Sequence, residues 1–201
     1  YCFYGSKRTM MLEIFNNSNS PFYRFGQVIF MNKIAKEDWI PFITSSFEKT
    51  GKECSTEYAS RICDIVECHS WYLQQLCYFI WSYTEGEVNE ESFNRGLKQT
   101  LNINTPMFQN DTENLSLSQI EMLKAISNGE TKLTSAEVKR RYSLGNPNTI
   151  TKNKLALTKR DILDNNKGTL TFIDPLYRLW LKGESIIFRK SLSFTRKNGS
   201  L

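Results

Sequence analysis

The chain has 201 residues, of which 40% are hydrophobic and 13% aromatic, and its formal net charge is +5. This size and composition allow one large domain or two small ones with a buried core. They exclude a membrane-spanning helix, because no apolar run approaches the roughly 18 to 20 residues required. No secretion signal is recognisable, so we expect a cytoplasmic protein without membrane insertion.

Five cysteines, an odd number, occur in this chain without secretory features, which favours reduced thiols over disulfides. Cys63, Cys68, His69 and Cys77 could suggest a zinc site. However, they contain no C-x-x-C pair, and their spacing fits no common zinc finger. Packed core thiols are the better interpretation, and we expect no metal site.

The charge is distributed unevenly. Residues 1–114 carry 10 basic and 14 acidic residues, net −4, whereas residues 115–201 carry 16 and 7, net +9. The sign changes at the linker-like stretch NINTPMFQNDTEN, residues 102–114, where we place a domain boundary. The basic half is the candidate to bind a polyanion.

The N-terminal region predicts a fragment of a parallel sheet. YCFY (1–4) is typical of a buried strand, TMMLEIFN (9–16) of a short helix, and FYRFGQVIFM (22–31) of a second strand. Two strands joined by a helix suggest a crossover unit, and such a sheet needs further strands for stability.

From residue 36 to about residue 101, apolar residues at three- and four-residue spacing predict four helices in a compact bundle. The first ends at Gly51, and the fourth runs from Asn89 to about Leu101. Gly51-Lys52 is not a phosphate-binding loop, because Ser46 and Glu53 occupy positions where that motif needs Gly and a hydroxyl residue.

The basic half shows a sequence of helix starts. Ser118–Glu121 and Thr134–Glu137 have the pattern of capping boxes, and Asn146-Pro147 begins a third helix that extends to about Thr158. The segment 161–174 alternates around Asn-Lys-Gly as a hairpin does, and Asp174-Pro175 begins a last helix. Three helices followed by a hairpin predict a winged helix-turn-helix domain.

The third of these helices could contact nucleic acid. It places Ile150 and Leu157 on one face and cations on another, and further cations lie nearby. Only Asn148 and Asn153 are suited to reading bases. The candidate phosphate-binding residues are Lys139, Arg140, Arg141, Lys152 and Lys159. A solvated basic face or a protein-docking surface is the alternative interpretation.

The chain lacks G-x-S-x-G, H-E-x-x-H and G-x-G-x-x-G motifs and has a single histidine. We therefore expect no autonomous catalysis. At CHSWYLQQL, residues 68–76, a helix starts directly after another ends, and its free N–H groups could bind an anion. The alternative is that His69 is a structural residue at a helix junction.

In order and spacing, these motifs resemble the C-terminal half of the archaeal-type ATPases, a branch of the AAA-type and STAND-type P-loop NTPases that is also common in Bacteroides. The resemblance covers nearly the whole chain. It is carried by YCFYGSKRTMMLEIF, PFYRFGQVIF, CHSWYLQQL, LSLSQIEMLKAISNGE, YSLGNPNTITKNKLAL and FIDPLYRLWL.

The resemblance implies roles for residues of the N-terminal region. Ser6 corresponds to the sensor-1 residue that faces the γ-phosphate and the attacking water, with Lys7 and Arg8 just beyond it. Arg24 lies where some relatives carry an arginine finger.

His69-Ser70 matches the Gly/Asn-His-Pro motif that opens the family's lid helix beside the nucleotide. Ser70 replaces the usual proline.

The fold class that the resemblance implies is mainly α with a small β part. Its segments are an αβ remnant of the P-loop core (1–34), a helical lid domain (35–114), a winged-helix domain (115–185) and a tail (186–201). Walker A and Walker B would precede residue 1, so we expect this chain to be part of a larger ATPase.

That ATPase would bind ATP and Mg²⁺ through the preceding core, whereas this chain alone would bind them weakly and be inactive. A DNA or protein client could dock on the winged helix, and the protein could form homo-oligomers. A stand-alone nucleic-acid binder and a protein-interaction adaptor remain the alternatives.

Overall fold

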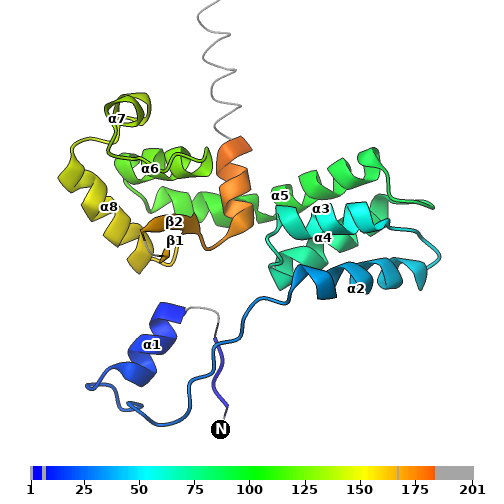
Figure 1. Cartoon of the computed structure of the whole chain (residues 1–201), viewed down its shortest axis with the longest axis horizontal. Coiled ribbons are helices and arrows are strands. Elements are labelled where there is room, and N and C mark those ends of the chain that lie inside the picture. Colours follow the sequence, from blue (N-terminus) through cyan, green and yellow to red (C-terminus); the bar gives the residue numbers. More distant parts are fainter. Residues whose placement is uncertain (1, 6–7, 167, 184–201) are drawn as a thin grey trace, which may run out of the picture.

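The computed structural model describes residues 2–5, 8–166 and 168–183, and most of these are helical. Figure 1 shows the helices of residues 36–83 gathered on one side of the molecule and the elements of residues 117–172 on the other, with the long helix of residues 90–113 reaching both groups. The N-terminal segment with α1 lies apart from both groups. No helix in the described part of the chain combines the length and apolar character needed to cross a membrane.

The N-terminal arm, which we define as the described residues of 2–34, contains the expected helix, α1 (Arg8–Asn16). The two predicted strands are wrong: residues 2–5 and 22–34 contain no strand. A strand persists only when a neighbouring strand accepts and donates its backbone hydrogen bonds. The described residues supply no such neighbour, so the edge of a P-loop core is not seen. The arm instead gathers four phenylalanine rings, of Phe3, Phe15, Phe22 and Phe25, whose neighbouring centroids lie 5.9–6.3 Å apart.

The predicted helical bundle is confirmed, and we use the name lid for these helices, after the family that the sequence resembles. Its first helix ends as expected, with Gly51 in the left-handed region at φ 75° and its N–H bonded to the Glu48 carbonyl. The bundle consists of α2 (Lys36–Glu48), α3 (Thr56–Ile65), α4 (Ser70–Tyr83) and α5 (Glu90–Glu113).

The fourth helix is longer than predicted, because α5 continues without interruption through the stretch 102–114 that we interpreted as a linker. Its buried positions recur every four residues, at Gly96, Thr100, Asn104 and Phe108. Only one of these four is a large apolar residue. Burial therefore repeats with the period of a helix, whereas hydrophobicity does not, and the sequence pattern does not reveal the full helix. The two halves of the molecule therefore share one helix.

The order of helices and strands in the basic half confirms a winged-helix arrangement. The hairpin strands are antiparallel, with Leu163 opposite Phe172, and Gly168 occupies the turn at φ 92°. A last helix covers residues 175–183. The other elements are α6 (Leu117–Ser127), α7 (Ala136–Tyr142), α8 (Pro147–Lys159), β1 (Leu163–Asn166) and β2 (Thr169–Phe172).

Two of the predicted caps are displaced. Helix α6 is capped by Ser116, whose hydroxyl accepts from Gln119 N–H while the Gln119 side chain accepts from Ser116 N–H. Helix α7 is capped by Ser135 rather than by the preceding threonine. In both places two hydroxyl residues lie within two positions of each other, and the one that caps is the one whose hydroxyl reaches the third helical N–H. Asn146 caps α8 as predicted.

A single hydrophobic core runs from Trp39 to Leu181 and includes residues of both halves. The C-terminal part of α5 makes the connection: Phe108 is fully buried, and its ring lies 5.4 Å from that of Tyr177 and 5.9 Å from that of Trp180. The lid and the winged helix are thus packed against each other through α5 and the helix 175–183.

Candidate functional site

The turn between α3 and α4 has an unusual backbone. Glu67 and Cys68 are consecutive left-handed residues, with φ values of 48° and 54°, and neither is glycine. Each such residue costs about 1–2 kcal/mol relative to the right-handed region. The Cys68 N–H donates to the Cys63 carbonyl at 2.9 Å, which closes the end of α3. The surrounding contacts therefore have to hold this turn in place.

His69 follows these two residues and occupies the N-cap position of α4, but its side chain does not cap the helix. Its Nδ1 atom is buried without a hydrogen-bond partner. The imidazole lies 4.8 Å from the Tyr72 ring. Burial lowers the pKa of His69, and the nearby Asp174 carboxylate only partly opposes this effect. Burial thus favours the neutral imidazole over the charged one.

Tyr72 connects this turn to the winged helix. Its hydroxyl donates to Asp174 Oδ2, and the other oxygen, Oδ1, accepts from the N–H groups of Leu176 and Tyr177, each at 2.9 Å. Burial and the neighbouring Asp174 carboxylate both raise the pKa of Tyr72, so the phenol keeps its proton. Asp174 therefore caps the helix 175–183, as the sequence predicts, and also binds the lid.

A second contact joins the same elements. Arg178 lies 2.9 Å from Glu67 Oε1, and Lys33 Nζ donates to the Glu67 carbonyl at 2.9 Å. Both side chains of the Arg178–Glu67 pair are partly exposed, so the pair by itself contributes little to stability. Together with the Tyr72–Asp174 bond, it fixes the turn at two points.

The structure brings together only part of the predicted nucleotide site. Ser70 is the first residue of α4, directly after His69. Arg8 begins α1 in the arm, whereas Ser6 and Lys7 lie outside the described residues. Arg24 is exposed, has φ 56°, and its guanidinium lies 5.1 Å from the centroid of the Tyr23 ring.

The outward face of α8 carries the predicted cations. Asn148, Lys152, Leu155 and Lys159 recur at three- and four-residue spacing and are all exposed, Leu155 at 68%. Neither lysine forms an ion pair with another described residue. Asn153 is different: it is buried and donates to Ser118 Oγ at 3.2 Å, so it holds α8 against α6 and is not free to read a base.

The three cations before α8 are not equivalent. Arg140 is exposed and Lys139 is half-buried. Arg141 is already paired, at 2.8 Å from Glu130 and 2.5 Å from Glu137. Of the predicted phosphate-binding residues, Arg141 is therefore the least available to a ligand.

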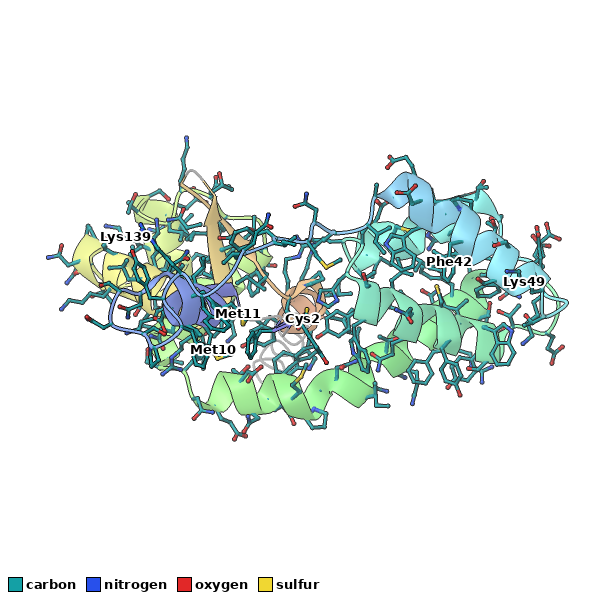
Figure 2. The ribbon with its side chains drawn as sticks, turned by 90° about the horizontal axis from the view of Figure 1, so that it is seen from below. Cys2, Met10, Met11, Phe42, Lys49 and Lys139 are labelled. Atoms are coloured by element: carbon teal, nitrogen blue, oxygen red, sulfur yellow. The ribbon has the colours of Figure 1, made fainter. Side chains whose placement is uncertain are left out.

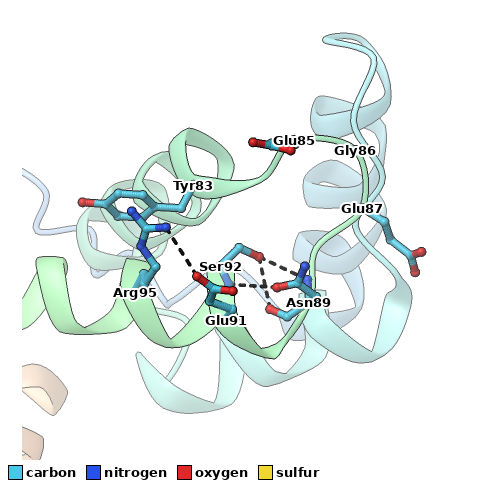
Figure 3. A pocket seen from close by; sticks show the side chains of 8 residues that line it. All are labelled: Tyr83, Glu85, Gly86, Glu87, Asn89, Glu91, Ser92 and Arg95. Atoms are coloured by element: carbon cyan, nitrogen blue, oxygen red, sulfur yellow. Dashed lines mark hydrogen bonds and ion pairs between the residues drawn. The ribbon is translucent and has the colours of Figure 1, made fainter.

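A cavity of about 460 Å³ lies at the start of α5, away from all of the predicted site residues (Figure 3). The Arg95 guanidinium lies 4.4 Å from the Tyr83 ring centroid and 3.6 Å from Glu91. Asn89 and Ser92 form the capping box of α5. The side chains of Asn89 and Ser92 therefore already bond to backbone N–H groups at the start of α5. The cavity is lined by Tyr83, Glu85, Gly86, Glu87, Asn89, Glu91, Ser92 and Arg95.

Tyr72, Glu67 and Arg178 are site residues that the sequence did not indicate. Tyr72 and Asp174 are 102 residues apart, and no periodicity or spacing connects them. One local signal was available: a tyrosine three residues after the histidine lies one helical turn away, next to it on the helix surface.

The comparisons with known proteins agree with this architecture. Residues 106–183 match the family model described as "Probable winged helix domain". The match starts within α5, in the part of the helix that packs against the winged helix. No curated protein matches the chain.

One solved structure with a similar fold is the Walker-type ATPase PABY2304 of Pyrococcus abyssi, with a TM-score of 0.64 and 16% sequence identity. The similarity covers 86% of this chain and 49% of that protein, so the chain spans about half the length of the ATPase. At this identity the likeness establishes a shared fold.

Proposed function

We propose that this chain forms the lid and winged-helix portion of a Walker-type ATPase, in which bound nucleotide controls the position of these two parts. The observation that carries the proposal is the fold similarity to the Pyrococcus abyssi ATPase over 86% of the chain. The finer family, a STAND-like ATPase of the archaeal type, rests on the order of the sequence motifs.

In this proposal a P-loop core that precedes the chain binds ATP and Mg²⁺, and the N-terminal arm belongs to the edge of that core. The exposed apolar side chains of the arm support this assignment: Phe25, Ile29 and Met31 are 61%, 74% and 93% exposed. Surfaces of this kind are normally covered by another part of a protein. Ser6, Lys7, Arg8 and Arg24 would then face the nucleotide from the arm.

The α3–α4 turn would supply the contact from the lid. A neutral imidazole with an unsatisfied Nδ1 atom, at the N-terminus of a 14-residue helix, can approach a nucleotide without placing a fixed charge there. His69 and Ser70 are the residues that we assign to this role.

The test uses the complete reading frame that contains this chain. We expect an upstream G-x-x-x-x-G-K-[ST] motif and binding of a fluorescent ATP analogue that requires Mg²⁺. His69→Ala should weaken that binding about tenfold, as the loss of one polar contact does. Tyr78→Phe, an exposed position on the same helix, is the matched control. Magnesium-dependent ATP hydrolysis by residues 1–201 alone would contradict the proposal.

A second candidate function, binding of duplex nucleic acid by the winged helix, is favoured by the row of exposed cations on α8. Binding through phosphates should weaken linearly on a plot of log affinity against log salt. We expect Lys152→Glu with Lys159→Glu to abolish it.

The matched control, Lys49→Glu with Lys98→Glu, makes the same charge change at exposed sites in the lid. Lys49 lies at the opposite end of the molecule from Lys139 (Figure 2). Equal losses in both variants would indicate binding by net charge alone. Salt-insensitive or absent binding would rule out this function and favour a protein partner.

A further inference from the structure

The lid and the winged helix are connected along the chain by α5, and this helix contains a proline. Pro106 has no N–H, so the carbonyl of Asn102 lacks its usual helical donor, and proline rings kink helices at this point. Two side chains just before it make extra bonds to helix carbonyls: Asn104 Nδ2 donates to the Thr100 carbonyl at 2.7 Å, and Thr105 Oγ1 to the Leu101 carbonyl at 2.9 Å.

The proline also lies at a structural boundary. The winged-helix family model begins at residue 106. Before it, α5 packs tightly against α4, where Gly96 lies against Ile80. After it, α5 contacts the winged helix, and Thr112 Oγ1 lies 2.8 Å from the Tyr177 hydroxyl. Pro106, where α5 lacks one backbone hydrogen bond, therefore separates the part of α5 that packs on α4 from the part that packs on the winged helix.

Away from α5, polar contacts join the two halves at the α3–α4 turn. Tyr72 binds Asp174, and Glu67 binds Arg178. Asp174 also accepts the first N–H groups of the helix 175–183, so a shift of this helix relative to α4 would break both of these contacts.

We propose that Pro106 is a hinge and that the Tyr72–Asp174 and Glu67–Arg178 contacts are a latch, which together set the position of the winged helix on the lid. The coupling follows from their location, because Glu67 and Tyr72 flank His69 and Ser70. A ligand that moves His69 therefore moves the latch. This last step rests on the proposed function, whereas the hinge and the latch themselves do not.

The experiment compares three forms of the 201-residue chain without nucleotide. The latch variant is Tyr72→Phe with Arg178→Gln. Its matched control is Tyr78→Phe with Lys182→Gln, which removes one phenol hydroxyl and one positive charge from the same two helices. Tyr78 and Lys182 are exposed, and neither side chain has a hydrogen bond or ion pair with another described residue.

In the latch variant, Asp174 no longer accepts a hydrogen bond from Tyr72, so it should hold the start of the helix 175–183 less firmly. The backbone amides of Leu176 and Tyr177 should then exchange with solvent about tenfold faster, which corresponds to the loss of one hydrogen bond to a charged group. Small-angle X-ray scattering should show a larger radius of gyration. The control should match the wild type in both measurements. Wild-type exchange and scattering in the latch variant would overturn the proposal.

The hinge has its own test. Pro106→Ala restores the missing N–H, which can then bond to the Asn102 carbonyl, and should stiffen α5 at this point. When it is added to the latch variant, the radius of gyration should return toward the wild-type value. If the latch variant remains expanded with alanine at position 106, the hinge is elsewhere and the proposal fails. Nucleotide is absent from all of these measurements, so a negative result here does not contradict the ATPase proposal. In the same way, a failure to bind ATP would not contradict the hinge and the latch.

Discussion

His69 is the only histidine in the chain, so its titration can be measured without interference from another imidazole. Its pKa is lowered in the folded state, chiefly by burial. Between that lowered pKa and the ordinary value of about 6.5, the unfolded chain therefore binds more protons than the folded chain. The free energy of unfolding should rise with pH through this window and level off above it.

Urea unfolding at several pH values from 5 to 8 measures this effect. In His69→Gln the rise between pH 5 and 7 should disappear, because carboxylates titrate mainly below this range. A proton NMR titration of the imidazole gives the pKa directly. A pKa above 6.5 in the folded chain would show that attraction by Asp174 exceeds the effect of burial.

The cysteines offer a second test at the scale of single residues. Burial raises the pKa of Cys54 and of Cys63 to about 11, which leaves little thiolate at neutral pH. Cys2, in contrast, is exposed. We expect iodoacetamide to modify Cys2 first, and Cys54 and Cys63 only when the chain unfolds. Mass spectrometry of digested samples measures the order, and Cys2→Ser should remove the fast phase. Rapid modification of Cys63 in the folded protein would contradict the packing of α3.

Among the helices, α4 and α5 meet most closely at Gly96. A Cβ atom at this position would lie 2.6 Å from Ile80 Cγ1 and 2.7 Å from the Ile80 backbone nitrogen, and backbone atoms cannot move aside easily. Alanine normally stabilises a helix relative to glycine by about 1 kcal/mol. Here we expect Gly96→Ala to lower the free energy of unfolding by about 1–3 kcal/mol, as overpacking does.

The control for this substitution is Gly86→Ala, where a Cβ atom meets no other atom within 4 Å. Its effect should stay within about 0.5 kcal/mol, which is usual for surface positions. Urea unfolding of both variants measures the two changes in the free energy of unfolding. A stabilised Gly96→Ala would mean that α4 and α5 can separate at little cost.

The elements differ in how well the sequence predicts them. The winged helix could be derived because its starts and turns are local, as at Asn146-Pro147 and Gly168. The extent of α5 could not, since Thr100 and Asn104 are buried without being apolar. The strands in the arm were predicted from apolar character alone, but a strand also requires a partner, which a local pattern cannot specify.

The same distinction applies to the candidate site. The resemblance predicted His69 and Ser70 as candidates, and the spacing of the cations predicted the face of α8 on which they lie. The latch was beyond sequence reasoning, because it depends on how the lid packs against the winged helix. Asn153 is the opposite case: its residue type suggested base contact, but its place on the buried face of α8 decides its role.

The described part of the molecule consists of a continuous core and an arm from which no residue belongs to that core. Every buried hydrophobic residue of the core lies between Trp39 and Leu181. The arm keeps much of its apolar surface in contact with solvent, with Tyr4 94% and Met31 93% exposed. The arm should therefore promote association of the chain in solution, while the lid and the winged helix provide its stability.

Removal of residues 1–34, which leaves the N-cap residue Ala35 of α2 in place, tests this division. The shortened chain loses the Lys33–Glu67 contacts but retains the Lys36–Asp64 ion pair at 2.6 Å and the whole core. Because the lost contacts are exposed, we expect the free energy of unfolding to change by less than about 1 kcal/mol. Binding of a hydrophobic dye and self-association, measured by fluorescence and by light scattering, should both decrease. A shortened chain that cannot fold would show instead that the arm packs on the core, which the exposure of its aromatic and aliphatic side chains argues against.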